Sequence, residues 1–145
     1  IDTWHDPEKG KLRGPNRIHI VTEKKTGKKL IHYGDIGEVI DDLLTEENLA
    51  LLKDADVALI PVGGTYTYDA DQALELIKRT SPKIAVPMHY RSAAGFGLSN
   101  IGTIEDFMVK AHNAGLKVRV VDLWFYDTDE YDMGECVLAI RPENI

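Results

Sequence analysis

The chain has 145 residues, of which 43% are hydrophobic and 28% charged, a composition typical of an ordinary globular protein. Its 24 acidic and 17 basic side chains give a net charge of −7, which argues against general binding to nucleic acid. The chain has a single cysteine and no signal-peptide pattern, and no apolar run approaches the roughly 20 residues that span a bilayer. We therefore predict one cytoplasmic domain over residues 1–145, without membrane partners.

The first half of the chain predicts a β-hairpin, a helix and a buried strand. It opens on Ile1 in a β-like run without any lead-in, which suggests a fragment of a longer chain. Residues 17–22 alternate apolar and polar side chains, and residues 30–33 return as a second strand after a charged turn. Thr45 is suited to cap a helix, because its hydroxyl can accept a bond from a free backbone N–H. Residues 57–62 form a nearly unbroken apolar run, the pattern of a strand buried on both faces.

The second half alternates helices and strands. A capping box begins at Asp69 and is followed by apolar residues at helical spacing, and Thr103 caps a further helix that ends near Gly115. The order β-β-α-β-α-β-α-β-β predicts an α/β domain in which helices cover a mixed sheet. The remaining predicted strands are residues 83–86, 117–125 and 136–140.

Two boundaries in this half follow from local rules. We expect the strand at residues 83–86 to end at Pro87, because proline has no N–H to donate to a strand ladder. We expect the acidic stretch Asp127–Asp132 to be a solvated hairpin turn between the last two strands, since the spacing of a calcium loop is absent.

Three predicted strand ends carry side chains that can bind a metal. They are His5, with Asp6 beside it, Asp35 between two glycines, and His89 after the Pro-Met step. Imidazole and carboxylate are the ligand types expected for zinc or a similar divalent ion. Each residue also has an ordinary explanation: a surface turn for His5, an Asx-turn for Asp35, and a carbonyl-capped histidine for His89.

Two further segments leave two interpretations open. Gly63 and Gly64, followed by Thr65, let the backbone approach a bound group, or they simply form the turn between a strand and a helix. Arg13 could present a cation to an anionic substrate, although a turn into the first strand is the simpler interpretation. Cys136 begins a strand without a paired base and is predicted to be a buried structural thiol.

The order of these segments resembles the metallo-β-lactamase-fold hydrolases. Five features occur in the succession found in that family, between about Trp4 and Tyr90: a strand-end histidine, then RGPN, HYGD, PVGGTYT and PMHY. The resemblance is greatest to the branch that contains ascorbate-6-phosphate lactonase-like and other zinc-dependent hydrolases. It implies an α/β fold that forms half of an αββα sandwich, in which two similar halves pack sheet against sheet.

The resemblance also implies a metal site. His5 would bind the first metal ion, His89 the second, and Asp35 would bridge both, because each carboxylate oxygen can serve one ion. Two zinc ions are expected, with manganese or iron as alternatives, and they would share a hydroxide that attacks a small-molecule ester, lactone or phosphodiester. Asp6 and His32 stand beside these ligands and would orient them, while Gly63, Gly64 and Thr65 would form a loop that faces the substrate.

The chain departs from the family in one respect. The HxHxDH segment that supplies the remaining ligands is absent from these residues, so the resemblance covers the C-terminal half only. We therefore expect the 145-residue chain alone to be inactive and to need the missing N-terminal half or a second chain as its partner. The alternative is a truncated, non-catalytic module that packs its exposed sheet on a partner or on itself as a homo-oligomer.

Overall fold

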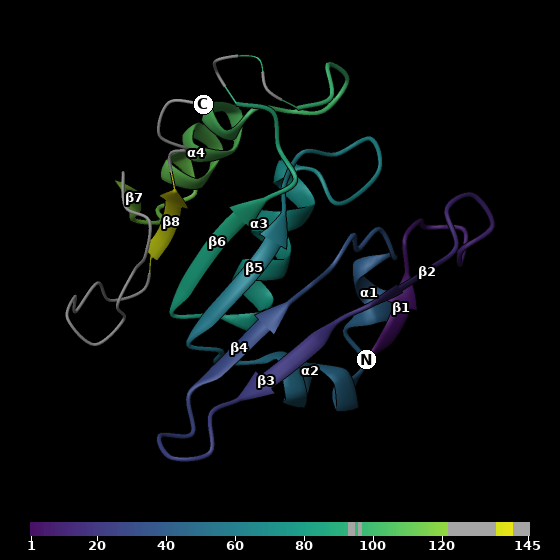
Figure 1. Ribbon diagram of the computed structural model, residues 1–145, viewed down its shortest axis with the longest axis vertical. Helices are drawn as coiled ribbons and strands as arrows, with labels where there is room; N and C mark the ends of the chain where they lie inside the picture. Colours follow the sequence, from purple (N-terminus) through teal and green to yellow (C-terminus); the bar gives the residue numbers. More distant parts are fainter. Residues whose placement is uncertain (93–94, 96, 122–135, 141–145) are drawn as a thin grey trace.

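The computed structural model describes all residues except 93–94, 96, 122–135 and 141–145 (Figure 1). Among the described residues, none of the helices has the length and hydrophobicity that a membrane-spanning segment needs. The strands are β1 (Asp2–Trp4), β2 (Pro15–Arg17), β3 (His19–Thr22), β4 (Lys29–His32), β5 (Val57–Pro61), β6 (Ile84–Met88), β7 (Val118–Val121) and β8 (Cys136–Ile140). The helices are α1 (Ile40–Leu43), α2 (Glu46–Leu52), α3 (Ala70–Thr80) and α4 (Ile104–Asn113).

The main element is a six-stranded mixed sheet of order β3-β4-β5-β6-β8-β7. The predicted hairpin is confirmed, because β3 and β4 pair antiparallel with Ile20 opposite Ile31. The neighbouring strands from β4 to β7 in this order pair parallel to one another. A separate two-stranded sheet of β1 and β2 precedes it, and neither these short strands nor α1 was predicted. The predicted α/β class with a mixed sheet is confirmed.

The predicted helix starts are confirmed at each cap. The Thr45 side chain accepts from the backbone N–H of the third helical residue of α2, and Thr103 does the same for α4. Asp69 forms the complete capping box with Gln72 at the start of α3. These bonds satisfy N–H groups that have no partner inside the helix, so they fix where each helix begins.

The helices cover one face of the sheet, and α3 lies behind β5 and β6 in Figure 1. Side chains of α3 and α4, such as Leu76 and Phe107, pack with Ile31 and Ile60 of the sheet in one buried core. The opposite face remains partly open, since Val21 and Leu30 are 58% and 39% exposed. A hollow of about 380 Å³ on this open face is lined by Val21, Glu23, Lys28, Lys29, Leu30, Asp56, Val57, Ile84, Val86, Leu138 and Ile140.

The predicted end of the strand at Pro87 is wrong, because β6 continues through Pro87 to Met88. The Met88 carbonyl accepts from Val62 N–H at 3.0 Å and therefore faces β5, so the backbone groups of Pro87 face β8. Pairing between β6 and β8 reaches only as far as Ala85. The N–H that proline lacks would have found no partner there, which explains why the strand tolerates it.

The predicted hairpin between the last two strands is also wrong. β7 and β8 pair parallel, with Val118 opposite Val137, and parallel neighbours require a crossover rather than a tight turn. The stretch Asp127–Asp132 lies outside the described residues. Cys136 is buried, and this burial raises the pKa of its thiol, as expected for a structural cysteine.

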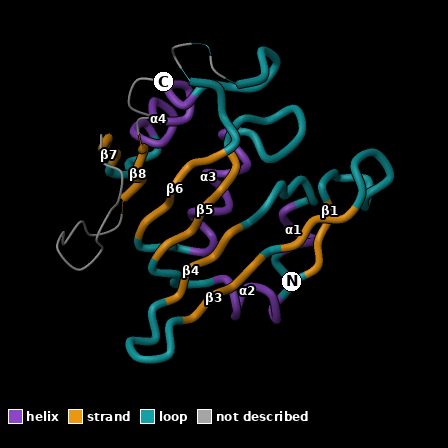
Figure 2. The backbone as a smooth tube through the Cα atoms, in the orientation of Figure 1, coloured by secondary structure: helices purple, strands orange, loops and turns teal. Residues whose placement is uncertain are grey.

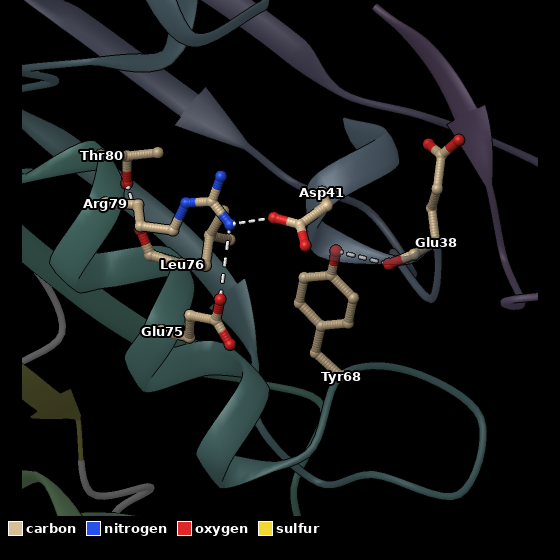
Figure 3. A network of polar contacts seen from close by, with 7 residues as sticks. All are labelled: Glu38, Asp41, Tyr68, Glu75, Leu76, Arg79 and Thr80. Carbon is tan, nitrogen blue, oxygen red and sulfur yellow. Dashed lines mark hydrogen bonds and ion pairs between the residues drawn. The ribbon is translucent and has the colours of Figure 1, made fainter. Parts of the chain in front are cut away.

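A polar network joins α3 to α1 and to the loop before it (Figure 3). Arg79 Nη1 donates to Asp41 at 2.6 Å and to Glu75 at 3.4 Å. The Tyr68 hydroxyl donates to the Glu38 carbonyl oxygen at 2.6 Å, and burial of the ring raises the pKa of Tyr68 well above its usual range. The network thus fixes the loop after β4 against α3.

Candidate metal centre

The loops that follow β4, β5 and β6 leave the same end of the sheet, because these three strands are parallel (Figure 2). They carry Asp35, the Gly63–Thr65 segment and His89, respectively. Loops at the carboxyl ends of parallel strands are where α/β proteins commonly place ligands. The structure therefore brings three of the predicted segments to one edge.

The loop that carries His5 is joined to the same edge. Gly37 N–H donates to the Trp4 carbonyl at 3.1 Å, and His5 N–H donates to Gly14 at 3.1 Å. A Cβ at Gly37 would overlap the backbone of His5, so only glycine allows this approach. The Nε2 atom of His5 is buried and has no hydrogen-bond partner among the described residues. Buried side-chain polar atoms usually have a hydrogen-bond partner, so Nε2 remains available to a group outside the described residues.

Asn16 holds the turn that presents Asp35. Its Oδ1 accepts from Asp35 N–H at 2.9 Å, and its Nδ2 donates to the Tyr33 carbonyl at 3.0 Å and to Thr3 Oγ1 at 2.8 Å. Gly34 between them has φ +62°, and a Cβ there would overlap Asn16 Oδ1. The Asp35 carboxylate itself is exposed and forms no hydrogen bond or ion pair within the described residues. Asn16 lies within the RGPN motif, but no local pattern predicts this contact, because it joins residues 19 positions apart.

His32 supports the same turn from β4. Its Nδ1 accepts from Gly34 N–H at 3.0 Å, so the neutral ring carries its proton on Nε2. His32 is paired across the sheet with His19, and both line a hollow of about 440 Å³ that also includes Asp35. The structure thus places His32 against the Asp35 turn, and its orienting role stays a prediction.

His89 occupies an uncommon backbone conformation, with φ +53°. Its carbonyl oxygen packs so closely on Gly63 that a Cβ at Gly63 would overlap it. Nδ1 of His89 lies 3.4 Å from Thr67 Oγ1, which leaves Nε2 without a partner in the described part of the chain. Glycine at position 63 is therefore required by the close approach of the His89 backbone.

The rest of that segment is a tight turn. Gly64 N–H donates to the Tyr68 carbonyl at 3.0 Å, and Gly64 and Thr65 both have positive φ, +70° and +61°. Tyr68 N–H in turn donates to the Ile36 carbonyl at 2.9 Å, which joins this loop to the Asp35 loop. The segment is therefore the turn between β5 and α3, and its approach to a bound group stays a prediction.

Asp6 has a different role from the one predicted. It is fully buried, and its two carboxylate oxygens accept backbone N–H bonds from Glu8, Gly10, Leu12 and Arg13 at 2.8–3.2 Å. Burial alone would raise its pKa, but these four bonds outweigh it and hold the pKa below the ordinary 3.8. Asp6 therefore builds the loop after His5, and within the described residues its carboxylate forms no hydrogen bond to His5, Asp35 or His89.

We predict that Asp6→Asn destabilises the fold more than it alters the chemistry. An amide cannot accept all four N–H bonds, so the melting temperature at pH 7 should fall by about 5–10 °C. Because the folded-state pKa of Asp6 is lowered, its stabilising contribution is present above the unfolded pKa and is lost as pH falls through the folded pKa. The gap between variant and wild type should therefore narrow below about pH 4.

Thermal melts from pH 3 to 8 would check this, with Asp54→Asn as the control. Asp54 is exposed and has φ +55°, which asparagine tolerates, so its melting temperature should not change. Equal melting temperatures for Asp6→Asn and Asp54→Asn at pH 7 would contradict the role given to Asp6.

The donor set suits a divalent metal ion but is incomplete. His5 Nε2, His89 Nε2 and the Asp35 carboxylate all lack partners within the described residues, and imidazole with carboxylate is a zinc-type combination. However, no group of three His, Cys, Asp or Glu side chains in the described part of the chain is arranged to hold an ion. The three predicted ligands thus do not form a closed metal centre by themselves, and their assignment stays a prediction.

The fold is an α/β domain in which Asp35 and His89 follow parallel strands and His5 lies on a loop joined to the same edge. Residues 1–89 match the family described as Beta-lactamase superfamily domain. The chain belongs to this superfamily, as the order of its motifs predicted.

Several known proteins are similar to this chain. A UPF0173 metal-dependent hydrolase from Thermoplasma acidophilum is 42% identical over 66 residues, which cover 46% of this chain and 28% of that protein. Another from Ignicoccus hospitalis is 38% identical over 100 residues, which cover 68% of this chain and 40% of that protein. A Thermotoga maritima crystal structure, described as a Zn-dependent hydrolase of the metallo-β-lactamase superfamily, aligns with a TM-score of 0.63 and 26% identity, over 88% of this chain and 59% of that one. The chain thus spans well under the full length of the relatives that it matches.

Proposed function

We propose that the full-length protein containing this chain is a metal-dependent hydrolase that uses two divalent ions, zinc in the first instance with manganese or iron as alternatives. Its substrate would be a small-molecule ester, lactone or phosphodiester. The observation that carries the proposal is the set of unpartnered donors on loops held together at one sheet edge. The names of the relatives, which are metal-dependent hydrolases, support it.

The residues of this chain would bind the metal ions or keep the binding residues in position. His5 would bind one ion through Nε2, His89 would bind the other, and Asp35 would contact both. When bound, the ions would supply hydroxide at neutral pH. Asn16 and His32 would keep the Asp35 turn in place by the bonds described above. Gly63 would hold the His89 backbone against the neighbouring loop.

The remaining ligands would come from outside the 145 residues, from an N-terminal half or from a second chain. Two observations support this part of the proposal: the incomplete ligand group and the greater length of the relatives. The location in the cytoplasm, the lactonase-like branch and the half-sandwich boundary stay predictions.

The open face of the sheet favours a second candidate, a non-catalytic module that binds through this face. Its apolar side chains, including Val21 and Leu30, would be stabilised by about 25 cal/mol for each Å² that a partner covers. The same face would serve the first candidate if the missing half covers it. The two candidates differ in whether the assembled protein holds metal.

Metal analysis of purified protein separates them. We expect about two ions for each full-length molecule and few or easily removed ions on the 145-residue chain, with circular dichroism as the check that it is folded. A folded full-length protein without metal, whose chains associate through the open face, would favour the second candidate. Two tightly held ions on the short chain would show that the ligand set is misassigned.

A further inference from the structure

We propose that Arg13 forms a binding subsite for an oxyanion beside the candidate metal centre, so that the substrate carries a phosphate or carboxylate group away from the bond that is cleaved. The statement about the substrate rests on the proposed function. The oxyanion site itself rests on the contacts of Arg13 described below.

The Arg13 guanidinium is held in place although it is exposed. Its Nη2 donates to the Thr65 carbonyl at 2.9 Å, and its carbon atom lies 5.4 Å from the centre of the Tyr66 ring. This is the distance at which a cation is attracted to the face of an aromatic ring. Because the side chain is already ordered, an anion that binds it loses less affinity to ordering the arginine.

Thr65 and Tyr66, which contact Arg13, are held in place by a third loop that carries Asn100. Thr65 Oγ1 donates to the Asn100 carbonyl at 2.6 Å, and Asn100 Nδ2 donates to the Tyr66 hydroxyl at 2.9 Å. Thr65 pays a conformational cost for this arrangement, since its φ is +61°. Several contacts and one strained residue thus support a single exposed guanidinium.

No carboxylate neutralises Arg13 within the described residues, even though the chain carries a net charge of −7. The other exposed pairs differ: Arg17 contacts Asp2 at 2.7 Å, and Lys110 contacts Asp71 at 2.5 Å. Arg13 therefore keeps an unmatched positive charge and free N–H donors. A guanidinium with free N–H groups is well matched to the oxygens of phosphate or carboxylate.

The position of Arg13 connects it with the candidate centre. Its backbone N–H donates to Asp6, the residue after His5, while its guanidinium reaches the loop in which Thr67 contacts His89. Arg13 thus joins the loop that carries His5 to the loop after β5, and that second loop contacts His89. A second cation, Arg91, follows His89 closely, and its Nε is buried without a hydrogen-bond partner in the described part of the chain.

The direct test is a calorimetric titration of metal-stripped full-length protein with inorganic phosphate at low ionic strength. Arg13→Met should weaken phosphate binding by about tenfold. Arg13→Lys keeps the charge but loses the planar fork, so its affinity for phosphate should lie between those of wild type and Arg13→Met. Arg17→Met is the matched control and should bind as wild type does, because Arg17 already has a carboxylate partner. Equal affinity of wild type and Arg13→Met would overturn the proposal.

A second readout excludes a purely structural role. In the metal-loaded protein, Arg13→Met should raise KM for the anionic ester 4-nitrophenyl succinate by about tenfold and leave KM for neutral 4-nitrophenyl butyrate unchanged. An equal rise for both esters would mean that Arg13 only fastens the two loops, and it would overturn the subsite. Wild-type protein that holds no metal and cleaves neither ester would refute the proposed hydrolase instead, and the phosphate titration would still decide the oxyanion site.

Discussion

Asp35→Asn should reduce the turnover of the full-length protein by on the order of a hundredfold or more while the fold is kept. Asparagine preserves the shape of the side chain, but its amide nitrogen is a poor metal ligand and its charge is zero. The Asp35 carboxylate is exposed and forms no hydrogen bond or ion pair within the described residues, so its loss removes little that stabilises the fold. The backbone bond from Asp35 N–H to Asn16 does not depend on the side chain.

The measurement is turnover of a panel of generic esters and phosphodiesters, with metal content and thermal melts on the same samples. Asp2→Asn is the matched control, since Asp2 lines the same hollow as Asp35 but is paired with Arg17 in an exposed ion pair. Such pairs contribute about 0–1 kcal/mol, so Asp2→Asn should retain activity. Near-normal turnover by folded Asp35→Asn would make Asp35 an ordinary turn residue.

The parts of the fold that the sequence predicted are those fixed by neighbours in the chain. The helix starts at Thr45, Asp69 and Thr103 depend on bonds to residues three positions on, and each is confirmed. The β3–β4 hairpin likewise depends on alternation within two adjacent segments. Local patterns could therefore place these elements without knowledge of the rest of the molecule.

Two of the errors concern partners far away in the chain. Pro87 was expected to end β6, but whether proline is tolerated depends on which neighbour faces it, and β8 is no longer paired there. The parallel pairing of β7 with β8 is equally non-local, and the short strands β1 and β2 have too few residues to show alternation. Burial and sheet order decide these features, and neither can be read from a short window of sequence.

The candidate site shows the same division. Residue type and position at strand ends were enough to select His5, Asp35 and His89, whereas the role of Asn16 could not be predicted, because its bond to Asp35 joins residues 19 positions apart. Asp6 was selected for its place beside His5, but its four backbone bonds show that it builds the loop.

Gly63→Ala should be the most damaging single change at the candidate centre outside the ligands themselves. The new Cβ would overlap the carbonyl oxygen of His89, a residue that already has φ +53°, so the backbone of His89 would have to move. A shift of about 1 Å in a ligand costs on the order of a hundredfold in rate, and overpacking of a buried position costs about 1–3 kcal/mol in stability.

Gly102→Ala provides a graded control for Gly63→Ala in the same group of loops. Its Cβ would lie 3.3 Å from the Gly63 carbonyl oxygen, a tight contact that a small movement relieves, so its melting temperature and turnover should change far less. The measurements are turnover, metal content and thermal melts of the full-length protein carrying each substitution. If the two variants lose activity and stability equally, crowding of His89 is not the cause. If Gly63→Ala keeps wild-type turnover and metal content, the position of His89 does not matter to the chemistry, and its assignment as a ligand fails.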